Sequence, residues 1–509
     1  MKICFLLQRR FAYIGHRMAV LLKQRYGIDQ FCGYASLPSS YLFLKNQKDI
    51  HYTGLLLDEE IFDRYKNEKL DIEYIKNFEK QYGIPNLWPY ICSDRVVRYG
   101  QLVREYPNDV SQYSHEEMLR IFQVVSKSIV EFLDKEKPDC VFISVVGSIA
   151  SLLLYQVAKQ KGIKTLILDN ARIGNRYFLN ERYDGSTYLD QSFQLFKQNQ
   201  TSAADENYLK QAADYLKQFQ EKPQYYFANS EAYSTFNNKA SLRRHFRFLA
   251  PSGMYRSLRW LWRQTKELAQ SGFKNYYTTI HPWNERWDKL NRKLRILIGY
   301  SDLFDPVNLK EDFVYFPLQS EPEAYPMLNA PLFMDQIWTA KQLARSLPAH
   351  YKLYVKDHPA MFGYRRRSYY QELKKIPNVR LIDPAVDSLK LIGHSKLVAT
   401  VSGTAGLEAA LLKKPVISFG NVSYNLLSAI KRCENVEDLP ILVKNQLDSY
   451  HYNEKDIINF LAALFKESVD VDLAKLWDLE GGRIVDRKTN ELAPLVDLIA
   501  EKLNLNLSK

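Results

Sequence analysis

Small, hydroxyl-bearing and acidic residues gather in one stretch of the sequence, VSGTAGLEAALLKKPVISFG, at residues 401–420. A β-branched run ends there at Ser402, Gly403 and Thr404, and a helical pattern that carries a glutamate follows. Glycine lets the backbone approach a ligand closely, and free N–H groups at the start of a helix attract phosphate. Glu408 lies one helical turn after Thr404, where its carboxylate could accept hydrogen bonds from a ribose diol. The stretch therefore predicts a nucleotide-binding turn, although an ordinary capped helix would have the same pattern.

A second group of reactive side chains follows the apolar run at residues 351–355. Lys356, His358 and Pro359 stand where this strand pattern ends, and three arginines follow at residues 365–367. Proline fixes the backbone of the turn, and the cations together suit a polyphosphate or a nucleoside monophosphate. A single histidine is more commonly structural, so its position at the end of a strand is what points to a ligand.

A third strand pattern, DFVYFPLQSEPE, ends in amide and acidic side chains at residues 312–323. Gln319, Glu321 and Glu323 follow its apolar part. Ligands of parallel sheets bind outside the carboxyl ends of the strands. We therefore expect these side chains to look into the same crevice as the two groups above.

Strands that alternate with helices must position all three groups. In the second half, strand patterns fall at residues 312–319, 351–359, 378–383, 396–403 and 415–420. The first half opens on a strand, KICFLLQ, and has a strand–helix–strand unit at residues 139–169. This alternation predicts an α/β protein with two parallel sheets, each covered by helices on both faces. Residues 453–504 have helical patterns, and an Asp-x-Asp sequence at 470–472 falls among them.

The composition is that of a globular chain with more than one domain. The chain has 509 residues, of which 46% are apolar, enough to form sizeable cores. The five cysteines are odd in number and scattered, which argues against a disulfide framework or a structural zinc site. We expect no signal peptide, because the apolar run before Arg9 is short. We also expect no membrane span, because residues 140–157 have the pattern of a buried strand followed by a helix.

The joint between the two halves carries most of the net positive charge. Residues 241–300 hold thirteen Lys or Arg residues against three Asp or Glu residues. They also hold four of the seven tryptophans: Trp260, Trp262, Trp283 and Trp287. Tryptophan beside arginine favours an anionic membrane surface, and a solvated helical linker is the alternative. Nucleic acid is the least favoured partner of this basic segment, and we expect none.

The segments FPLQSEPEAY, VKDHP and VSGTAGLEAALLKKPVISFG, with Tyr424, resemble the capsule polysaccharide synthesis family of bacterial glycosyltransferases, which includes the capsule Kdo transferases. The strong resemblance covers residues 312–425, whereas the first half is similar only in its layout and in short pieces such as GIPNLWPY and DNARIGNR. The resemblance implies a GT-B fold, in which two Rossmann-like domains face each other across a cleft. It also implies that the nucleotide-sugar donor binds the C-terminal domain and the acceptor the N-terminal one.

The resemblance places His358 and Pro359 at the phosphate and nucleotide of the donor, residues 402–404 at the phosphate, and Glu408 at the ribose. The family position that is often a pair of Ser or Thr residues is Ser-Gly-Thr here, which leaves the nucleotide open. With the strand-end residues added, the predicted donor site consists of Gln319, Lys356, His358, Pro359, Ser402, Gly403, Thr404 and Glu408.

Transfer at the anomeric carbon requires stabilisation of the leaving phosphate, which His358 and the turn would supply. It also requires a base for the acceptor hydroxyl or a carboxylate facing the sugar. Asp169, at the end of the strand in LILDNARIG, is the first candidate, and Glu323 and Glu321 are the second; a turn cap shared with Asn170 is the structural alternative for Asp169. An anionic acceptor would bind Arg9, His16 and Arg172. Most GT-B enzymes need no metal for the chemistry, and we expect neither a metal nor a cofactor.

The sequence therefore predicts a glycosyltransferase that moves a sugar from a nucleotide-sugar donor, with a CMP-linked sugar among the candidates, to a growing surface or capsular polysaccharide or its lipid-linked acceptor. Another GT-B-type enzyme (a sugar-nucleotide epimerase or a polyol-phosphate polymerase) and a non-catalytic assembly protein remain alternatives. We expect an acceptor domain at 1–240, the basic joint at 241–300, a nucleotide-sugar domain at 301–450 and C-terminal helices at 451–509. The expected location is the cytoplasm, with the joint on the inner face of the membrane.

Overall fold

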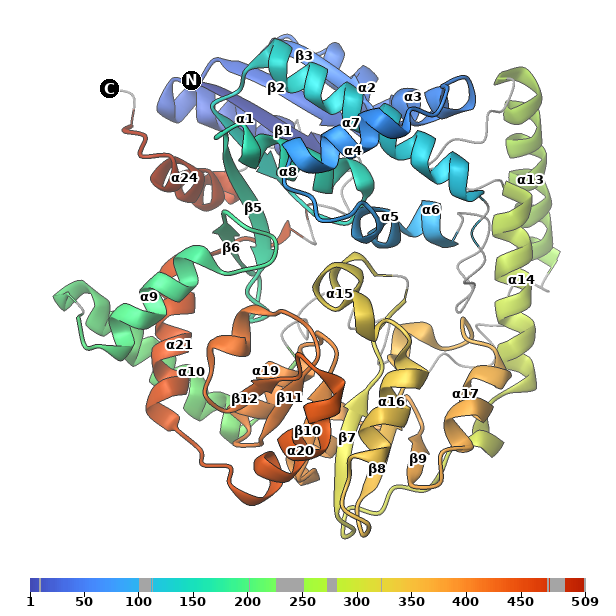
Figure 1. The fold of residues 1–509 in the computed structure, drawn as a ribbon, viewed down its shortest axis with the longest axis vertical. Helices are drawn as coiled ribbons and strands as arrows, with labels where there is room; N and C mark the ends of the chain where they lie inside the picture. The colour runs from blue at the N-terminus through green and yellow to red at the C-terminus, as the bar shows by residue number, and fades with distance from the viewer. Residues whose placement is uncertain are drawn as a thin grey trace.

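The computed structural model describes residues 1–8, 11–99, 111, 113–200, 202–225, 251–271, 282–321, 323–473, 476 and 490–507. Within these residues the chain forms two sheets surrounded by helices (Figure 1). The first sheet has the strand order β13-β6-β5-β4-β1-β2-β3, and the second has the order β12-β11-β10-β7-β8-β9. The predicted α/β class with two Rossmann-like, largely parallel sheets is confirmed.

The first sheet is parallel from β3 to β5 and ends in two strands that alternate in direction. Its strands are β1 (Lys2–Leu7), β2 (Gln30–Ala35), β3 (Tyr52–Leu57), β4 (Cys140–Ile143), β5 (Lys164–Asn170), β6 (Arg176–Asn180) and β13 (Ser468–Asp470). β6 is antiparallel to β5, and β13 is antiparallel to β6. β4 is buried along its whole length, as expected for a strand whose sheet is covered on both faces.

Helices cover both faces of the first sheet. They are α1 (Phe11–Tyr26), α2 (Pro38–Lys45), α3 (Asp58–Asp63), α4 (Ile72–Gln81), α5 (Trp88–Ser93), α6 (Arg95–Tyr99), α7 (His115–Glu136) and α8 (Ile149–Gln160), with the 3₁₀ turn η1 (Arg64–Lys66). One face packs on α4 to α8 and the other on α1. The predicted helix after the uncharged strand is α8, which begins at a capping box formed by Ser148 and Ser151.

The second sheet is parallel throughout. Its strands are β7 (Phe313–Pro317), β8 (Lys352–Lys356), β9 (Val379–Ile382), β10 (Leu397–Thr400), β11 (Val416–Ser418) and β12 (Ile430–Arg432). Five of the six lie where the sequence predicts strands. β12 has only three residues, two of them exposed, which leaves no periodic pattern for a sequence argument to detect.

The second sheet is covered by α15 (Ala324–Asn329), α16 (Gln336–Arg345), α17 (Arg367–Lys374), α18 (Ser388–His394), α19 (Ala405–Leu411) and α20 (Leu439–Asp448). Short 3₁₀ turns lie between these elements: η3 (Ser301–Leu303), η4 (Pro331–Phe333), η5 (Pro359–Met361), η6 (Ser423–Leu426) and η7 (Val436–Asp438). α15 and α5 contact each other where the two halves of the molecule meet (Figure 1).

The two halves are also joined by segments that pass between them. α9 (Thr187–Lys197) and α10 (Glu206–Glu221), with η2 (Ala203–Asp205) before α10, pack against α21 (Glu454–Glu467), and α10 also touches α19. After α21 the chain returns to the first sheet as β13. η8 (Asn490–Leu492) and α24 (Ala493–Lys502) follow, and α24 packs on α1.

The C-terminal tail is mainly helical, as predicted, but it is not helical throughout. The Asp-x-Asp sequence was expected in the N-terminal region of a helix; Asp470 instead ends β13, whereas Asp472 directly precedes the helical residue Leu473. For Asp470 the expectation was wrong because the backbone of Ser468–Asp470 pairs with the edge of β6. That partner lies nearly 300 residues earlier in the chain, so no local pattern indicates it. The predicted domain boundaries remain a prediction.

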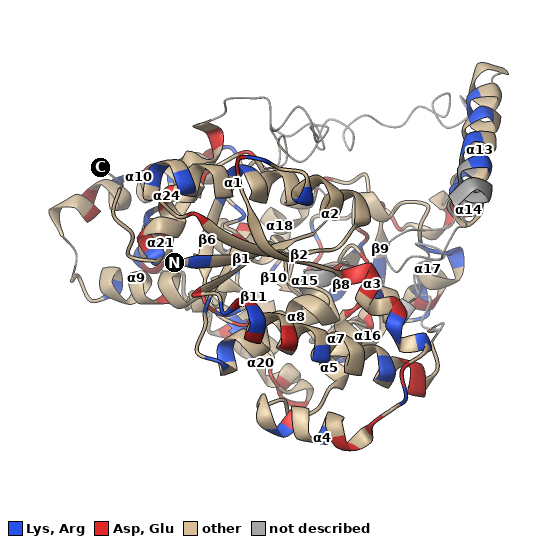
Figure 2. Ribbon diagram, turned by 90° about the horizontal axis from the view of Figure 1, so that it is seen from above, with Lys and Arg blue, Asp and Glu red and all other residues tan. Residues whose placement is uncertain are grey.

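Two helices form the described part of the basic joint. α13 (Pro251–Ser271) and α14 (Pro282–Ile298) lie side by side at the edge of the molecule (Figure 1). Seen from above, α13 projects past the rest of the ribbon (Figure 2). Within the described residues, no helix combines the length and the hydropathy that crossing a membrane would require.

Candidate functional site

The predicted donor residues come together because three neighbouring strands of the second sheet end at one edge. β10, β7 and β8 are adjacent and parallel, so the chain segments that follow them lie next to one another. Thr400, the last residue of β10, ties two of these segments together. Its Oγ1 accepts hydrogen bonds from the backbone N–H of Gly403 (3.1 Å) and from Nε2 of Gln319 (3.3 Å). A Cβ on Gly403 would lie 2.7 Å from Gln319 Nε2, so any larger residue there would displace the end of the Gln319 side chain.

The turn after β10 is built from small residues that lie close to Tyr424. The Tyr424 hydroxyl donates to the carbonyl oxygen of Gly403, and a Cβ on Gly406 would lie 2.8 Å from the Tyr424 ring. Ser402 is 2% exposed, and its Oγ has no hydrogen-bond partner among the described residues. A buried hydroxyl without a partner costs free energy. The arrangement therefore leaves a polar atom in the turn that a ligand could satisfy.

Two buried groups of opposite charge lie beside this turn. Burial raises the pKa of Glu408 to about 7, a shift that a hydrogen bond with Thr404 opposes. Burial lowers the pKa of Lys356 to about 8, and nearby carboxylates, Asp357 first among them, oppose that shift. Lys356 Nζ donates to the carbonyl oxygen of Pro384 at 3.2 Å. Both side chains are thus desolvated, and both titrate close to neutral pH.

His358 is held in a defined orientation at the end of β8. Its Nδ1 accepts from the backbone N–H of Ala360 at 3.1 Å, so the neutral ring carries its proton on Nε2. Burial lowers the pKa of His358, which favours this neutral form. Pro359 begins η5 and is exposed. The His-Pro sequence therefore makes a short 3₁₀ turn that presents the ring at the strand end.

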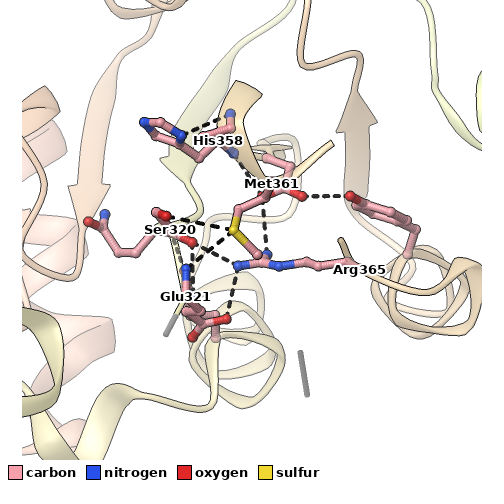
Figure 3. A network of polar contacts seen from close by, with 10 residues as sticks. Ser320, Glu321, His358, Met361 and Arg365 are labelled. Atoms are coloured by element: carbon pink, nitrogen blue, oxygen red, sulfur yellow. Dashed lines mark hydrogen bonds and ion pairs between the residues drawn. The ribbon is translucent and has the colours of Figure 1, made fainter. Parts of the chain in front are cut away.

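A buried ion network lies directly behind His358 (Figure 3). Arg365 is completely buried and pairs with Glu321 (2.9 Å) and Asp357 (3.2 Å). Its Nη2 also donates to the carbonyl oxygen of Gln319 at 2.7 Å. The network ties the segment after β7 to the segment after β8. Arg365 is thus paired with two carboxylates. The sequence had instead suggested that it is one of the cations that bind the phosphate of a ligand.

The other polar contacts of these two segments support the same arrangement. The Tyr370 hydroxyl donates to Oδ2 of Asp357 at 2.6 Å. The backbone N–H of Glu321 contacts Sδ of Met361 at 3.4 Å (Figure 3). Arg367, also among the three predicted arginines, pairs with Asp302 at the surface. Glu321, which the sequence predicted to look into the crevice, is therefore buried in an ion network.

One arginine of the first half reaches the turn at residues 402–404. Arg172 has a positive φ of 58°, and its Nη1 donates to the carbonyl oxygen of Ser402 at 2.6 Å. Its guanidinium also lies 5.8 Å from the centre of the Tyr424 ring. The residues that follow β5 and those that follow β10 therefore meet, although they belong to different sheets.

The positive charge of Arg172 lowers the pKa of three nearby carboxylates. Burial raises the pKa of Asp169, and Arg172 opposes the shift. Glu323 is an exposed residue by its accessible surface. Desolvation by the surrounding protein nevertheless raises the pKa of its carboxylate, and the positive charge of Arg172 opposes this shift. Arg172 likewise opposes the raised pKa of Glu408. Asp169 Oδ1 accepts from the N–H of Asn170 at 2.8 Å, so the predicted turn cap exists.

The predicted acceptor residue His16 is buried within the first half. His16 lies on α1 and is 1% exposed. It contacts Asp49 (3.3 Å) and the Tyr52 hydroxyl (3.1 Å), and its ring edge packs on Phe43. These contacts hold helix and strand together within the first half. Arg9 lies outside the described residues.

Sequence reasoning did not single out Thr400, Asn421 or the Arg365 network. Asn421 follows β11, and its Nδ2 donates to the carbonyl oxygen of Asp184 in the first half. Its position after a strand was a usable signal, because β11 is a neighbour of β10. Within the part of the chain that the structure describes, no group of three or more His, Cys, Asp or Glu side chains could hold a metal ion.

Comparisons with known proteins match parts of this chain. The model of the family described as "Capsule polysaccharide biosynthesis protein" matches residues 333–428. Protein FixF of Sinorhizobium fredii is 28% identical over 131 residues, which are 25% of this chain and 31% of FixF. The match thus spans less than a third of that relative.

Solved structures are similar at low identity. The β-Kdo 2,7 transferase of Thermosulfurimonas dismutans KpsC has a TM-score of 0.36 at 12% identity, covering 81% of this chain and 97% of that one. The UDP-GlcNAc 2-epimerase of Methanocaldococcus jannaschii has a TM-score of 0.24 at 13% identity, covering 92% and 98%. The family match contains β8, the His358 turn, β10 and residues 402–404. Residues 333–428, which carry most of the site in the second sheet, are thus similar to the capsule polysaccharide biosynthesis family.

Proposed function

We propose that this protein is a glycosyltransferase of GT-B type that transfers a sugar from a nucleotide-sugar donor to a surface or capsular polysaccharide or its lipid-linked acceptor. The observation that carries the proposal is the hydrogen bond between Arg172 Nη1 and the carbonyl oxygen of Ser402 (2.6 Å). It joins a strand end of the first sheet to the turn of the second. A transfer reaction needs two substrates at one point, and substrates held on different sheets meet where those sheets meet.

The donor occupies the edge of the second sheet. Its phosphate lies against the turn at residues 402–404, where the unpartnered Oγ of Ser402 and the close approach allowed by Gly403 suit an oxyanion. His358 donates from Nε2, and Lys356 supplies a positive charge once the phosphate has raised its pKa. Glu408 binds the ribose, and Gln319 completes the site. The nucleotide is CMP or another nucleoside phosphate.

The chemistry breaks the bond between the anomeric carbon and the phosphate oxygen and forms a bond from that carbon to the acceptor oxygen. The leaving nucleotide takes the electron pair, and its charge is stabilised by the turn and His358. The acceptor hydroxyl loses its proton to a carboxylate. Asp169 is the first choice for this base, because its raised pKa favours proton capture and it lies next to Arg172. Glu323 is the second choice, and no step is assigned to a metal.

Ligand-dependent thermal stability tests the donor site. CMP, CDP, UDP and GDP are compared, since a ligand at about 100 times its Kd stabilises the fold by about 2.7 kcal/mol. At least one should raise the melting temperature, and His358→Ala and Glu408→Ala should each weaken that effect. His350→Ala is the matched control, because His350 is exposed and lies before β8. If none of the four nucleotides stabilises the protein, the donor assignment fails.

A donor-only reaction separates transfer from the alternative activities. With the nucleotide sugar that gives the largest shift and no acceptor, a transferase should leave the sugar configuration unchanged. An epimerase would invert a centre of the sugar without an acceptor. Turnover that appears only when a glycan acceptor is added supports the proposal. Nucleotide binding without turnover on any acceptor would favour a non-catalytic role.

A further inference from the structure

α13 and α14 carry a large share of the exposed apolar surface of the described chain. Ten of its 21 exposed large apolar side chains lie on these two helices. They are Met254, Tyr255, Leu258, Trp262, Trp283, Trp287, Leu290, Leu294, Leu297 and Ile298. Trp262 is 66% exposed and Trp287 63% exposed. Isolated exposed apolar residues are normal, but a concentration of this kind marks an interaction surface.

The apolar residues of α14 form one stripe. Trp283, Trp287, Leu290, Leu294 and Leu297 follow one another at alternating intervals of four and three residues, so they share one face of the helix. The intervals are also those of a helix-packing seam, for which a second helix would be a partner. The stripe is thus an apolar face that remains open to solvent in the described chain.

The opposite face of α14 is the one that holds it to the second sheet. Arg295 Nη1 donates to the carbonyl oxygen of Tyr364 at 2.8 Å, and the Arg292 guanidinium stacks 4.2 Å from the Tyr364 ring. Gly363 lies so close to Ile296 that a Cβ there would be 2.8 Å from its Cγ1. Because residues 363 and 364 follow the His358 turn, α14 is fixed to the donor segment, and its apolar face points away.

Basic side chains border the apolar residues of both helices. Together the helices contain nine Lys or Arg residues and three Asp or Glu residues. On α13, Arg259, Arg263 and Lys266 lie within four residues of Trp262 in the sequence, and Lys266 Nζ stands 5.3 Å from the Trp262 ring. Figure 2 shows Lys and Arg residues as blue bands along α13. A second copy of the chain would bring the same positive charge to the contact, which disfavours self-association through this surface.

We propose that α13 and α14 form a docking surface for an anionic lipid bilayer. The exposed tryptophans and leucines enter the headgroup region, where indole rings are favoured, and the basic residues contact the anionic headgroups. The surface is fixed to the segment after His358, so docking holds the proposed donor edge beside the lipid. This orientation rests on the proposed function, whereas the binding itself does not.

Vesicle co-sedimentation of the full chain without nucleotide tests the docking surface. The vesicles are pure phosphatidylcholine, or phosphatidylglycerol and phosphatidylcholine in a one-to-two ratio. Binding is expected only to the anionic vesicles at about 0.1 M salt and should be lost at about 1 M, where the Debye length falls from about 10 Å to about 3 Å. Because nucleotide is absent, failure of the donor site would leave this result unchanged.

Two variants and a control separate the contributions. Arg259→Gln, Arg263→Gln and Lys266→Gln together should weaken partitioning by on the order of 100-fold, at about fivefold for each charge. Trp262→Ser with Trp287→Ser should weaken it at least about tenfold. Trp88→Ser with Trp338→Ser, which removes two exposed tryptophans elsewhere, should change nothing, and circular dichroism checks that each variant folds.

Three results would overturn the proposal. One is equal binding to neutral and anionic vesicles, or none to either. The second is a loss in the control variant as large as that in the Trp262/Trp287 variant. The third is a dimer seen by sedimentation velocity that the Trp262/Trp287 variant abolishes while vesicle binding persists, which would assign the apolar face to a second copy of the chain.

Discussion

Replacing Arg365 with methionine should strongly destabilise the second sheet and the helices that cover it. The guanidinium is completely buried and is the ion-pair partner of both Glu321 and Asp357. Methionine fills much of the same volume but leaves these two carboxylates without the cation. Breaking a buried ion pair by removing one partner costs about 3–5 kcal/mol, chiefly because a charge stays buried without compensation. For a domain of this size the melting temperature should fall by roughly 6–20 °C.

The pH dependence of this loss distinguishes an uncompensated charge from a packing defect. In Arg365→Met, the buried carboxylates can be neutralised by protonation as the pH falls from about 7 to about 4. The difference in stability from the wild type should therefore shrink over that range. A cavity or a steric clash would cost the same at both pH values. Adding Glu321→Gln should recover part of the stability, because it removes one of the two carboxylates that lost their cation, and Asp357 keeps its hydrogen bond from Tyr370.

The assay must report on the second domain, since a chain with two sheets need not unfold in one step. Hydrogen exchange of the amides in β7 and β8, followed with thermal melts at both pH values, gives that resolution. Arg367→Gln is the matched control, because it removes an arginine two positions away that pairs with Asp302 at the surface. A loss of stability in Arg367→Gln as large as that in Arg365→Met would contradict this prediction. So would a loss in Arg365→Met that does not depend on pH.

Three further predictions concern titration and packing in the donor turn. Glu408 has a pKa of about 7 in the folded chain, compared with about 4.3 in the unfolded chain, so between these values the folded state binds one more proton. The free energy of unfolding of the wild type should therefore fall by about 3 kcal/mol as the pH rises from about 4 to above 7. Denaturation of Glu408→Gln at a series of pH values should lack this slope. Lys356 has a pKa of about 8, which a bound phosphate should raise, so calorimetry near pH 8 in buffers of different ionisation enthalpy should detect proton uptake on nucleotide binding, and Lys356→Met should abolish it. Gly406→Ala should lower the free energy of unfolding by about 1–3 kcal/mol, because the new Cβ would lie 2.8 Å from the Tyr424 ring. The control in the same denaturation series is Gly393→Ala, where no atom lies within 4 Å of the new Cβ, and it should not be destabilised.

The parallel sheet and the donor turn were accessible from the sequence because their signals are local. Apolar runs that end in Gln319, Lys356 and Ser402 indicate strand ends, and strand ends of one parallel sheet must meet. The contact of Arg172 with Ser402 was not accessible, since it joins residues 230 positions apart in different halves. This contact depends on how the two sheets are placed relative to each other, and the spacing of apolar residues along the sequence carries no information on that placement.

The sequence also did not show which charged residues are buried. Three consecutive arginines after a His-Pro pair look alike in the sequence, yet Arg365 is completely buried and Arg367 is at the surface. The difference arises from which carboxylates the neighbouring segment brings, and Glu321 comes from another strand end. His16 shows the same limit, because only the fold reveals that Asp49 and Tyr52 already contact its ring.

The return of the chain to its first sheet has a consequence for how the protein is made. β1 starts at residue 2, but the edge strand β13 is supplied by residues 468–470. During synthesis, the edge of β6 must therefore stay unpaired until residues 468–470 have left the ribosome. An open edge strand is a site for pairing with other chains, and slow vectorial folding prolongs its exposure. A nascent chain that stalls before residue 468 would thus carry an unfinished sheet exposed to aggregation and to the chaperones that bind such edges.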